Sequence, residues 1–96
     1  MQSKNAKAIT KAEREQLARV KALPCSVCDL PGPSEAHHIK QGQHWTCVAL
    51  CQECHTGVHT GWHGRKAMWA VKHMDELDAL AVTIHRLVEK MREVIF

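Results

Sequence analysis

The chain has 96 residues, a formal net charge of +3 at pH 7, and only one Phe, three Trp and no Tyr to fill a core. This length predicts a single domain over residues 1–96 with about two layers of structure. No apolar run approaches the roughly 18 residues that a membrane-spanning helix needs, which excludes an integral membrane protein. We therefore expect a cytoplasmic protein without a membrane partner, in which a bound metal ion contributes to stability.

The N-terminal quarter of the chain combines a polar arm with a basic helix. Residues 1–8 are expected to form a flexible basic arm. The capping box that begins at Thr10 predicts a helix to about Ala22, which Pro24 ends. Residues 1–24 contain six basic and two acidic residues, which suits contact with phosphates but is equally typical of a solvated helix. The candidate contacts with a nucleic-acid backbone are Lys4, Lys7, Lys11, Arg14, Lys40, Arg65 and Lys66.

Two Cys-x-x-Cys pairs follow this helix, about twenty residues apart. Such pairs are typical of a tetrahedral zinc site, because two turns joined by a hairpin can bring four thiolates together. Disulfides or small buried residues are the alternatives, and a redox role is less favoured because no βαβ pattern surrounds the pairs. The sequence thus predicts a structural zinc site with the ligands Cys25, Cys28, Cys51 and Cys54.

Two short strands and a helix are predicted between and after the cysteine pairs. The strands span residues 35–40 and 45–50, and the helix spans residues 51–58. The fifth cysteine, Cys47, falls in the second strand and is expected to be a small buried residue.

Histidines occupy the first strand and the helix at spacings that suit a second metal. His55 and His59 are four residues apart, so they would share one helix face. Only one residue of the His37-His38 doublet could join them, because successive strand residues point to opposite sides. Three imidazoles with open positions are typical of a catalytic metal, and the fourth could take a proton from water. The alternative is that these are ordinary surface or core histidines, and His63 could replace His59 if the helix ends early.

The C-terminal third is predicted to be helical. Residues 65–73 form one expected helix, with Met68 and Trp69 facing inward, and residues 75–94 form a longer amphipathic helix. The apolar stripe of the longer helix consists of Leu77, Leu80, Ala81, Ile84, Leu87, Val88 and Met91. This stripe should be buried against the first helix and the zinc hairpin, or else in a homodimer or against a partner protein. Both a monomer and a homodimer through this helix remain open.

The order of these motifs resembles the HNH, or ββα-metal, endonucleases in their zinc-stabilised form. The resemblance rests on Cys-x-x-Cys, on His37-His38-Ile39, and on Leu50-Cys51-x-x-Cys54-His55-x-x-x-His59. More narrowly, Leu23-Pro24-Cys25 and the helical residues 77–87 are similar to phage recombination-enhancement nucleases, which act with a RecA-type filament. The resemblance implies a small α+β fold with a treble-clef-like ββα-metal core over residues 25–60, stabilised by a structural zinc with four cysteine ligands. An N-terminal helix and a helical C-terminal part over residues 64–95 would flank this core.

The resemblance also implies a role for each site residue. His37, His55 and His59 would hold a catalytic Mg²⁺ or another divalent ion, and His38 would be the general base. The loop-positioning Asn of the family falls on Thr46, so support of the base could pass to Gln41, Gln43 or His44.

The implied activity is hydrolysis of DNA phosphodiester bonds to 5′-phosphate and 3′-hydroxyl ends, in recombination or DNA processing. The expected partners are DNA and a RecA-type recombinase filament, in the cytoplasm of a bacterial host. The alternative is a non-catalytic zinc module that binds nucleic acid or a recombination protein. Such a module would need the cysteines and the basic arm but not the four histidines.

Overall fold

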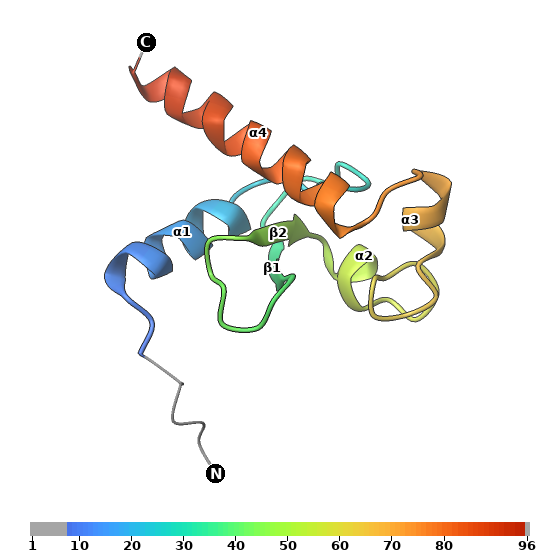
Figure 1. Cartoon of the computed structure of the whole chain (residues 1–96). Coiled ribbons are helices and arrows are strands. Elements are labelled where there is room, and N and C mark those ends of the chain that lie inside the picture. Colours follow the sequence, from blue (N-terminus) through green and yellow to red (C-terminus); the bar gives the residue numbers. More distant parts are fainter. Residues whose placement is uncertain (1–7, 96) are drawn as a thin grey trace.

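The computed structural model describes residues 8–95 (Figure 1). Most of the arm predicted over residues 1–8, including Lys4 and Lys7, lies outside the described residues. The elements in chain order are α1 (Lys11–Lys21), β1 (Glu35–His38), β2 (Cys47–Leu50), α2 (Gln52–Thr56), α3 (Ala67–Val71) and α4 (Glu76–Ile95). The prediction of a small α+β fold is confirmed, although both strands and the helices α2 and α3 are shorter than expected.

The first helix begins at the predicted capping box. The Thr10 hydroxyl accepts a hydrogen bond from the Glu13 backbone N–H at 3.1 Å, and the Glu13 carboxylate accepts one from the Thr10 N–H at 2.8 Å. These two bonds satisfy N–H groups that the first turn of a helix leaves without partners. The helix therefore has a fixed start, and its Val20, with Leu23 just after it, packs against β2.

The sheet consists of β1 and β2 in antiparallel pairing, with His37 opposite Val48 and His38 opposite Cys47. Side chains of β2 alternate between two core clusters. Val48 and Leu50 pack in one cluster with Trp69, whereas Cys47 and Ala49 pack with residues of α1 and the turn after it. Because both faces are covered, all four residues of β2 are buried, and the prediction of a buried Cys47 is confirmed.

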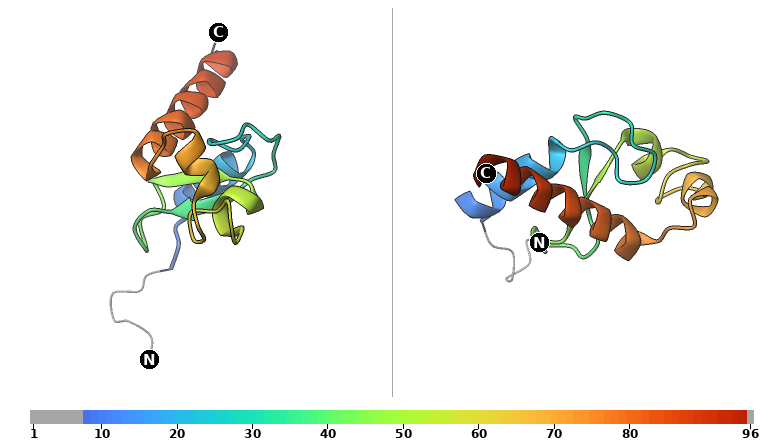
Figure 2. Two further views of the ribbon diagram at one scale, coloured as in Figure 1. Left: turned by 90° about the vertical axis from the view of Figure 1, so that its right-hand side faces the viewer. Right: turned by 90° about the horizontal axis from the view of Figure 1, so that it is seen from above.

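Helix α4 covers the outer edge of β2 (Figure 2). The Ala49 N–H donates to the Thr83 hydroxyl at 3.3 Å, and the Ala49 carbonyl accepts from the Ser26 N–H at 2.8 Å. The Ser26 and Thr83 hydroxyls also bond to each other at 2.7 Å. The backbone groups of Ala49 that an edge strand normally leaves unpaired are therefore satisfied by α4 and by the turn that contains Ser26.

Five of the seven residues in the predicted apolar stripe of α4 are exposed, so most of the stripe is not buried against α1 and the cysteine-bearing turns. Its burial in a homodimer or against a partner protein stays a prediction. The residues that α4 turns toward the sheet are Ala79 and Thr83, both fully buried. Ala79 is small, so it lets the helix approach the sheet closely, and the Thr83 hydroxyl bonds the edge of the strand. A hydropathy pattern selects neither residue, because it identifies large apolar side chains. The outward residues are instead Leu77 (68% exposed), Ile84 (46%), Val88 (45%) and Met91 (59%).

Helix α4 is also the longest helix, with 20 residues. Neither α4 nor any other helix within residues 8–95 is both long and apolar enough to span a membrane.

Candidate metal centres

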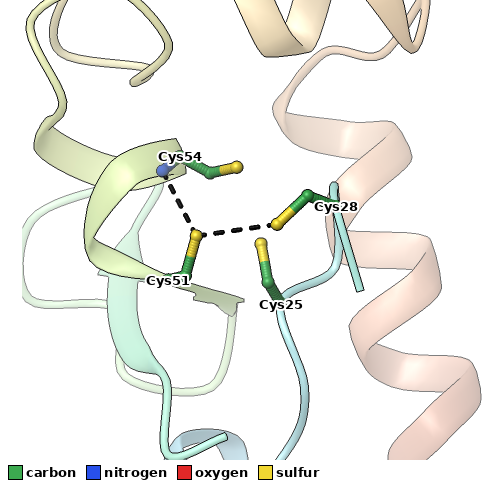
Figure 3. Close-up of side chains that lie close together, drawn as sticks. All are labelled: Cys25, Cys28, Cys51 and Cys54. Carbon is green, nitrogen blue, oxygen red and sulfur yellow. Dashed lines mark hydrogen bonds between the residues drawn. The ribbon is translucent and has the colours of Figure 1, made fainter. Parts of the chain in front are cut away.

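The four predicted zinc cysteines come together from two parts of the chain (Figure 3). Cys25 and Cys28 lie in the turn after α1, Cys51 is the N-cap of α2, and Cys54 lies within α2. Their Sγ atoms all lie within 4.8 Å of one another, and those of Cys28 and Cys51 are 3.7 Å apart. A tetrahedral zinc with Zn–S bonds of about 2.3 Å separates its sulfurs by about 3.8 Å. The cluster therefore has the composition and spacing to bind zinc.

The thiols of this cluster differ in their tendency to ionise. Burial opposes ionisation of Cys25, but hydrogen bonds from the backbone N–H groups of Cys28, Cys51 and Val27 outweigh it and lower its pKa. Burial raises the pKa of Cys51, and burial together with the negative charge of Cys25 raises that of Cys54. A bound cation would compensate the negative charge that opposes further ionisation, so metal binding here should release protons.

Three histidines form a second cluster. His37 lies on β1, His55 on α2, and His63 in the loop between α2 and α3. One nitrogen of each ring lies within 4.8 Å of the other two. The ring centroids are 5.1, 5.2 and 5.1 Å apart, so the rings are arranged as a nearly regular triangle. Imidazole nitrogens in this number and arrangement could hold a metal ion such as zinc.

The third histidine of this cluster is His63, whereas the expected one was His59. Helix α2 ends at Thr56, so the i, i+4 relation between His55 and His59 no longer places them on one helix face. The chain instead turns back, and the His63 N–H donates to the His55 carbonyl at 3.1 Å. The side chain of His59 is exposed and lies outside the cluster.

Glycines make this return possible. A Cβ atom on Gly61 would lie 2.5 Å from the Gly57 nitrogen, and one on Gly64 would lie 2.3 Å from the Gly57 carbonyl oxygen. Neither distance is sterically possible, so only glycine allows the loop to fold this tightly on the end of α2. The glycines on both sides of His63 are therefore the sequence signal for its position.

Two carboxylates support the histidine cluster, and neither was predicted. Glu76 Oε2 on α4 lies 2.5 Å from His37 Nε2, and Glu35 Oε1 on β1 lies 2.7 Å from His55 Nδ1. Metal-binding histidines usually donate their second ring N–H to a carboxylate, which fixes the ring and raises its basicity. These contacts leave the other nitrogen of each ring for an ion. Glu35 could have been found from sequence, since it is two residues before His37 on the same strand face.

The electrostatics of His37 favour the neutral ring. Burial is the largest influence and lowers the pKa of His37, and electrostatic repulsion from His55 and His63 lowers it further. The hydrogen bond and the charge of Glu76 act in the opposite direction but do not reverse the shift. A neutral imidazole at pH 7 is the form that binds a metal ion.

The substitution Glu76→Gln tests this support. It keeps the side-chain shape but removes the charge that orients and polarises His37, so metal affinity at the histidine cluster should fall by about tenfold or more. Calorimetric titration of Zn²⁺ or Co²⁺ into protein that already holds its structural zinc measures this affinity. Glu93→Gln, an exposed position on the same helix, is the matched control and should bind as the parent does. Equal affinities of the Glu76→Gln variant and the parent would contradict the role of the carboxylate.

The predicted base, His38, lies outside the cluster and pairs with His44. His38 Nε2 and His44 Nδ1 are 3.0 Å apart, and the two rings are nearly perpendicular. Burial, followed by the positive charges of His44, His37 and Lys21, lowers the pKa of His38. Thr46, at the position of the Asn in the HNH family, is half-buried in the loop between β1 and β2, which also contains His44. The structure thus places His44, one of three alternatives, against His38.

Comparison of the chain with protein-family models, curated proteins and solved structures found no match. The likeness to HNH enzymes therefore remains a hypothesis based on motifs and on the geometry of the two clusters.

The remaining predicted site residues within residues 8–95 are basic and solvent-accessible. Lys11, Arg14, Lys40, Arg65 and Lys66 are all exposed. Arg65 and Lys66 lie in the same loop as His63, and the Lys66 ammonium lies 4.0 Å from the centre of the Trp62 ring. The contact with Trp62 consequently holds the positive charge of Lys66 three residues away in the chain from His63.

Proposed function

We propose that this protein is a metal-dependent endonuclease of the HNH type that hydrolyses DNA phosphodiester bonds, leaving 5′-phosphate and 3′-hydroxyl ends. The observation that supports this most is the histidine cluster of His37, His55 and His63, which is separate from a cysteine cluster that already suffices for a structural zinc. The order β1, β2, α2 and the position of the cysteines agree with the zinc-stabilised ββα-metal core that the motifs imply. A structural role alone would not require a second cluster that consists only of histidines.

A divalent cation in the histidine cluster would act as a Lewis acid on the scissile phosphate and stabilise charge on the departing 3′ oxygen. The motif resemblance implies Mg²⁺ or another divalent ion. Three imidazoles suit Zn²⁺, Co²⁺, Ni²⁺ or Mn²⁺ better than Mg²⁺, so among these we propose one of the softer ions. Glu76 and Glu35 would hold two of the ligand rings in place.

His38 would take the proton of the attacking water, with His44 as its orienting partner. If His38 Nε2–H donates to His44 Nδ1, the Nδ1 of His38 carries no proton and can accept one. His44 then faces the ring in which positive charge develops, and it keeps that ring in one orientation. This division into a base and an orienting group is common to many hydrolytic sites.

The substrate that we propose is the DNA backbone. Arg65 and Lys66 lie in the loop of His63, and Lys40 is two residues after β1, so exposed positive charge is near in sequence to the elements that carry the histidine cluster. Contacts to phosphates position a nucleic acid without reading its bases, so we expect low sequence specificity. Action on recombination intermediates with a RecA-type filament rests on the motif resemblance and belongs to the same proposal.

The substitution His38→Ala tests the proposal. Loss of a general base typically slows a reaction by about 10² to 10⁴, so nicking of supercoiled plasmid should become barely detectable. The assay uses zinc-loaded protein with each divalent metal supplied in turn. The metal content of the variant should equal that of the parent, because His38 lies outside both clusters.

His85→Ala, on the exposed surface of α4, is the control for loss of an arbitrary histidine and should cut at the parent rate. Plasmid cleavage by His38→Ala at the parent rate would show that this residue is not the base. A parent protein that binds DNA but cuts it with none of the metals would instead support the non-catalytic zinc module.

A further inference from the structure

Helix α4 carries an apolar surface that faces away from the sheet. Its residues follow one another at steps of four, three, four and three: Leu77, Ala81, Ile84, Val88 and Met91. We call these five residues the outer seam. All five are exposed, and an alternation of three and four is the spacing of the buried positions in a coiled coil. The outer seam thus has the spacing of a helix-pairing surface in addition to its hydrophobicity.

No other described element covers this surface. Figures 1 and 2 show α4 lying across one side of the molecule, with its outer side open along its length and its C-terminal turns projecting beyond α1. A groove of about 420 Å³ lies between α1 and these last turns. It is lined mainly by Leu23, Leu87, Met91 and Val94, with Arg19 and Lys90 at its rim. Met91 belongs to both the groove and the outer seam, so the two form one continuous apolar surface.

We propose that the outer seam pairs with the outer seam of a second copy of this chain, with the two α4 helices antiparallel. A two-fold axis between residues 84 and 88 places Ile84 opposite the partner subunit's Val88, and Ala81 opposite the partner subunit's Met91. Each layer then combines residues of complementary size, as closely packed helices require. The same register brings the partner subunit's Leu77 to the end of α4, beside the groove that Met91 and Val94 line.

The charges next to the outer seam favour this orientation. Asp78 and Arg92 lie on the same flank of the seam, two heptads apart. In the antiparallel pair, Asp78 lies near the level of the partner subunit's Arg92, and the contact occurs twice by symmetry. A parallel pair would place like charges at equal levels. This self-complementarity of both the apolar layers and the charges is the reason that we assign the surface to a second copy and not to an unrelated protein.

The test is the oligomeric state of the full zinc-loaded chain without DNA, measured by sedimentation equilibrium at micromolar and higher concentrations. The parent should be a dimer. Ile84→Glu and Val88→Glu each place a carboxylate in a central layer and should raise the dimer Kd by about 100-fold or more. Val71→Glu is the matched control, because Val71 is 70% exposed on α3 and outside the seam, and it should leave the Kd unchanged.

A further substitution decides whether the two α4 helices are antiparallel or parallel. Arg92→Asp should weaken an antiparallel dimer by about tenfold, because each substituted carboxylate faces the partner subunit's Asp78, whereas a parallel pair would not be weakened. Circular dichroism and zinc content verify that each variant is folded. A monomeric parent at all concentrations would overturn the proposal, and so would a folded pair of Ile84→Glu and Val88→Glu variants that dimerise as the parent does. None of these measurements depends on the proposed nuclease activity.

Discussion

The substitution Cys54→Ala is expected to unfold the protein. Cys25, Cys51 and Cys54 are three of the eight buried residues in the main core cluster, so the candidate zinc ligands are themselves part of the core. A structural zinc contributes about 10 to 16 kcal/mol in small metallodomains, which equals or exceeds the net stability of about 5 to 15 kcal/mol of most domains. Loss of one of four sulfurs should therefore remove the cooperative thermal transition. Far-ultraviolet circular dichroism with a metal analysis of the same sample measures both effects.

Cys47→Ala is the matched control for this result. Cys47 is 1% exposed, so the same chemical change occurs at equal burial, but its sulfur is outside the zinc cluster. Burial raises the pKa of Cys47 to about 11, so it remains a neutral thiol at pH 7. Its truncation should cost only about 1 to 2 kcal/mol and leave one tightly bound zinc per chain. A Cys54→Ala protein as stable as Cys47→Ala would show that zinc does not hold this fold together.

Features with local sequence signals were predicted well. The capping box at Thr10 fixes the start of α1 through two bonds within one turn, and such a signal survives in any tertiary context. The cysteine pairs are also a local signal, because two short Cys-x-x-Cys motifs indicate a candidate set of metal ligands without knowledge of the fold. Period-two and helical patterns also located β1, β2 and α4, although the strand ends shifted by up to two residues.

Features that depend on long-range packing were missed. Glu76 reaches His37 across 39 positions of the chain, so no local pattern connects them. The inner face of α4 was predicted from hydropathy, but the open edge of β2 needed a hydroxyl, and Thr83 supplies it. The larger apolar residues were consequently left on the outside of the helix. His63 was predicted only as the replacement for His59 if the helix ended early, and α2 does end early, at Thr56. The turn that then brings His63 to the cluster results from backbone contacts between glycines and the end of α2.

His63→Ala is expected to abolish the second metal site, whereas His59→Ala should leave it intact. The ring of His63 is 5.2 Å from that of His37 and 5.1 Å from that of His55, so it completes the triangle of imidazoles. Removal of a direct ligand should cost more than the roughly 10- to 100-fold loss typical of an orienting group, so affinity should fall by more than about 100-fold. Titration of Co²⁺ or Zn²⁺ into zinc-loaded protein gives the affinity, and plasmid nicking gives the associated loss of activity.

The two histidines form a matched pair, because both are exposed and lie in the same loop. Substitution of an exposed side chain normally changes stability by about 0.5 kcal/mol or less, so neither variant should differ from the parent in its thermal transition. A difference in metal affinity between the two variants therefore shows which of the two imidazoles binds the ion, without a contribution from a change in stability. If His59→Ala lost the second ion and His63→Ala retained it, the turn after α2 would have to differ from the observed one, and the original i, i+4 pair would be restored as the ligand set. If both variants retained the ion, the triangle of rings would not be its binding site, and the nuclease proposal would lose its main support.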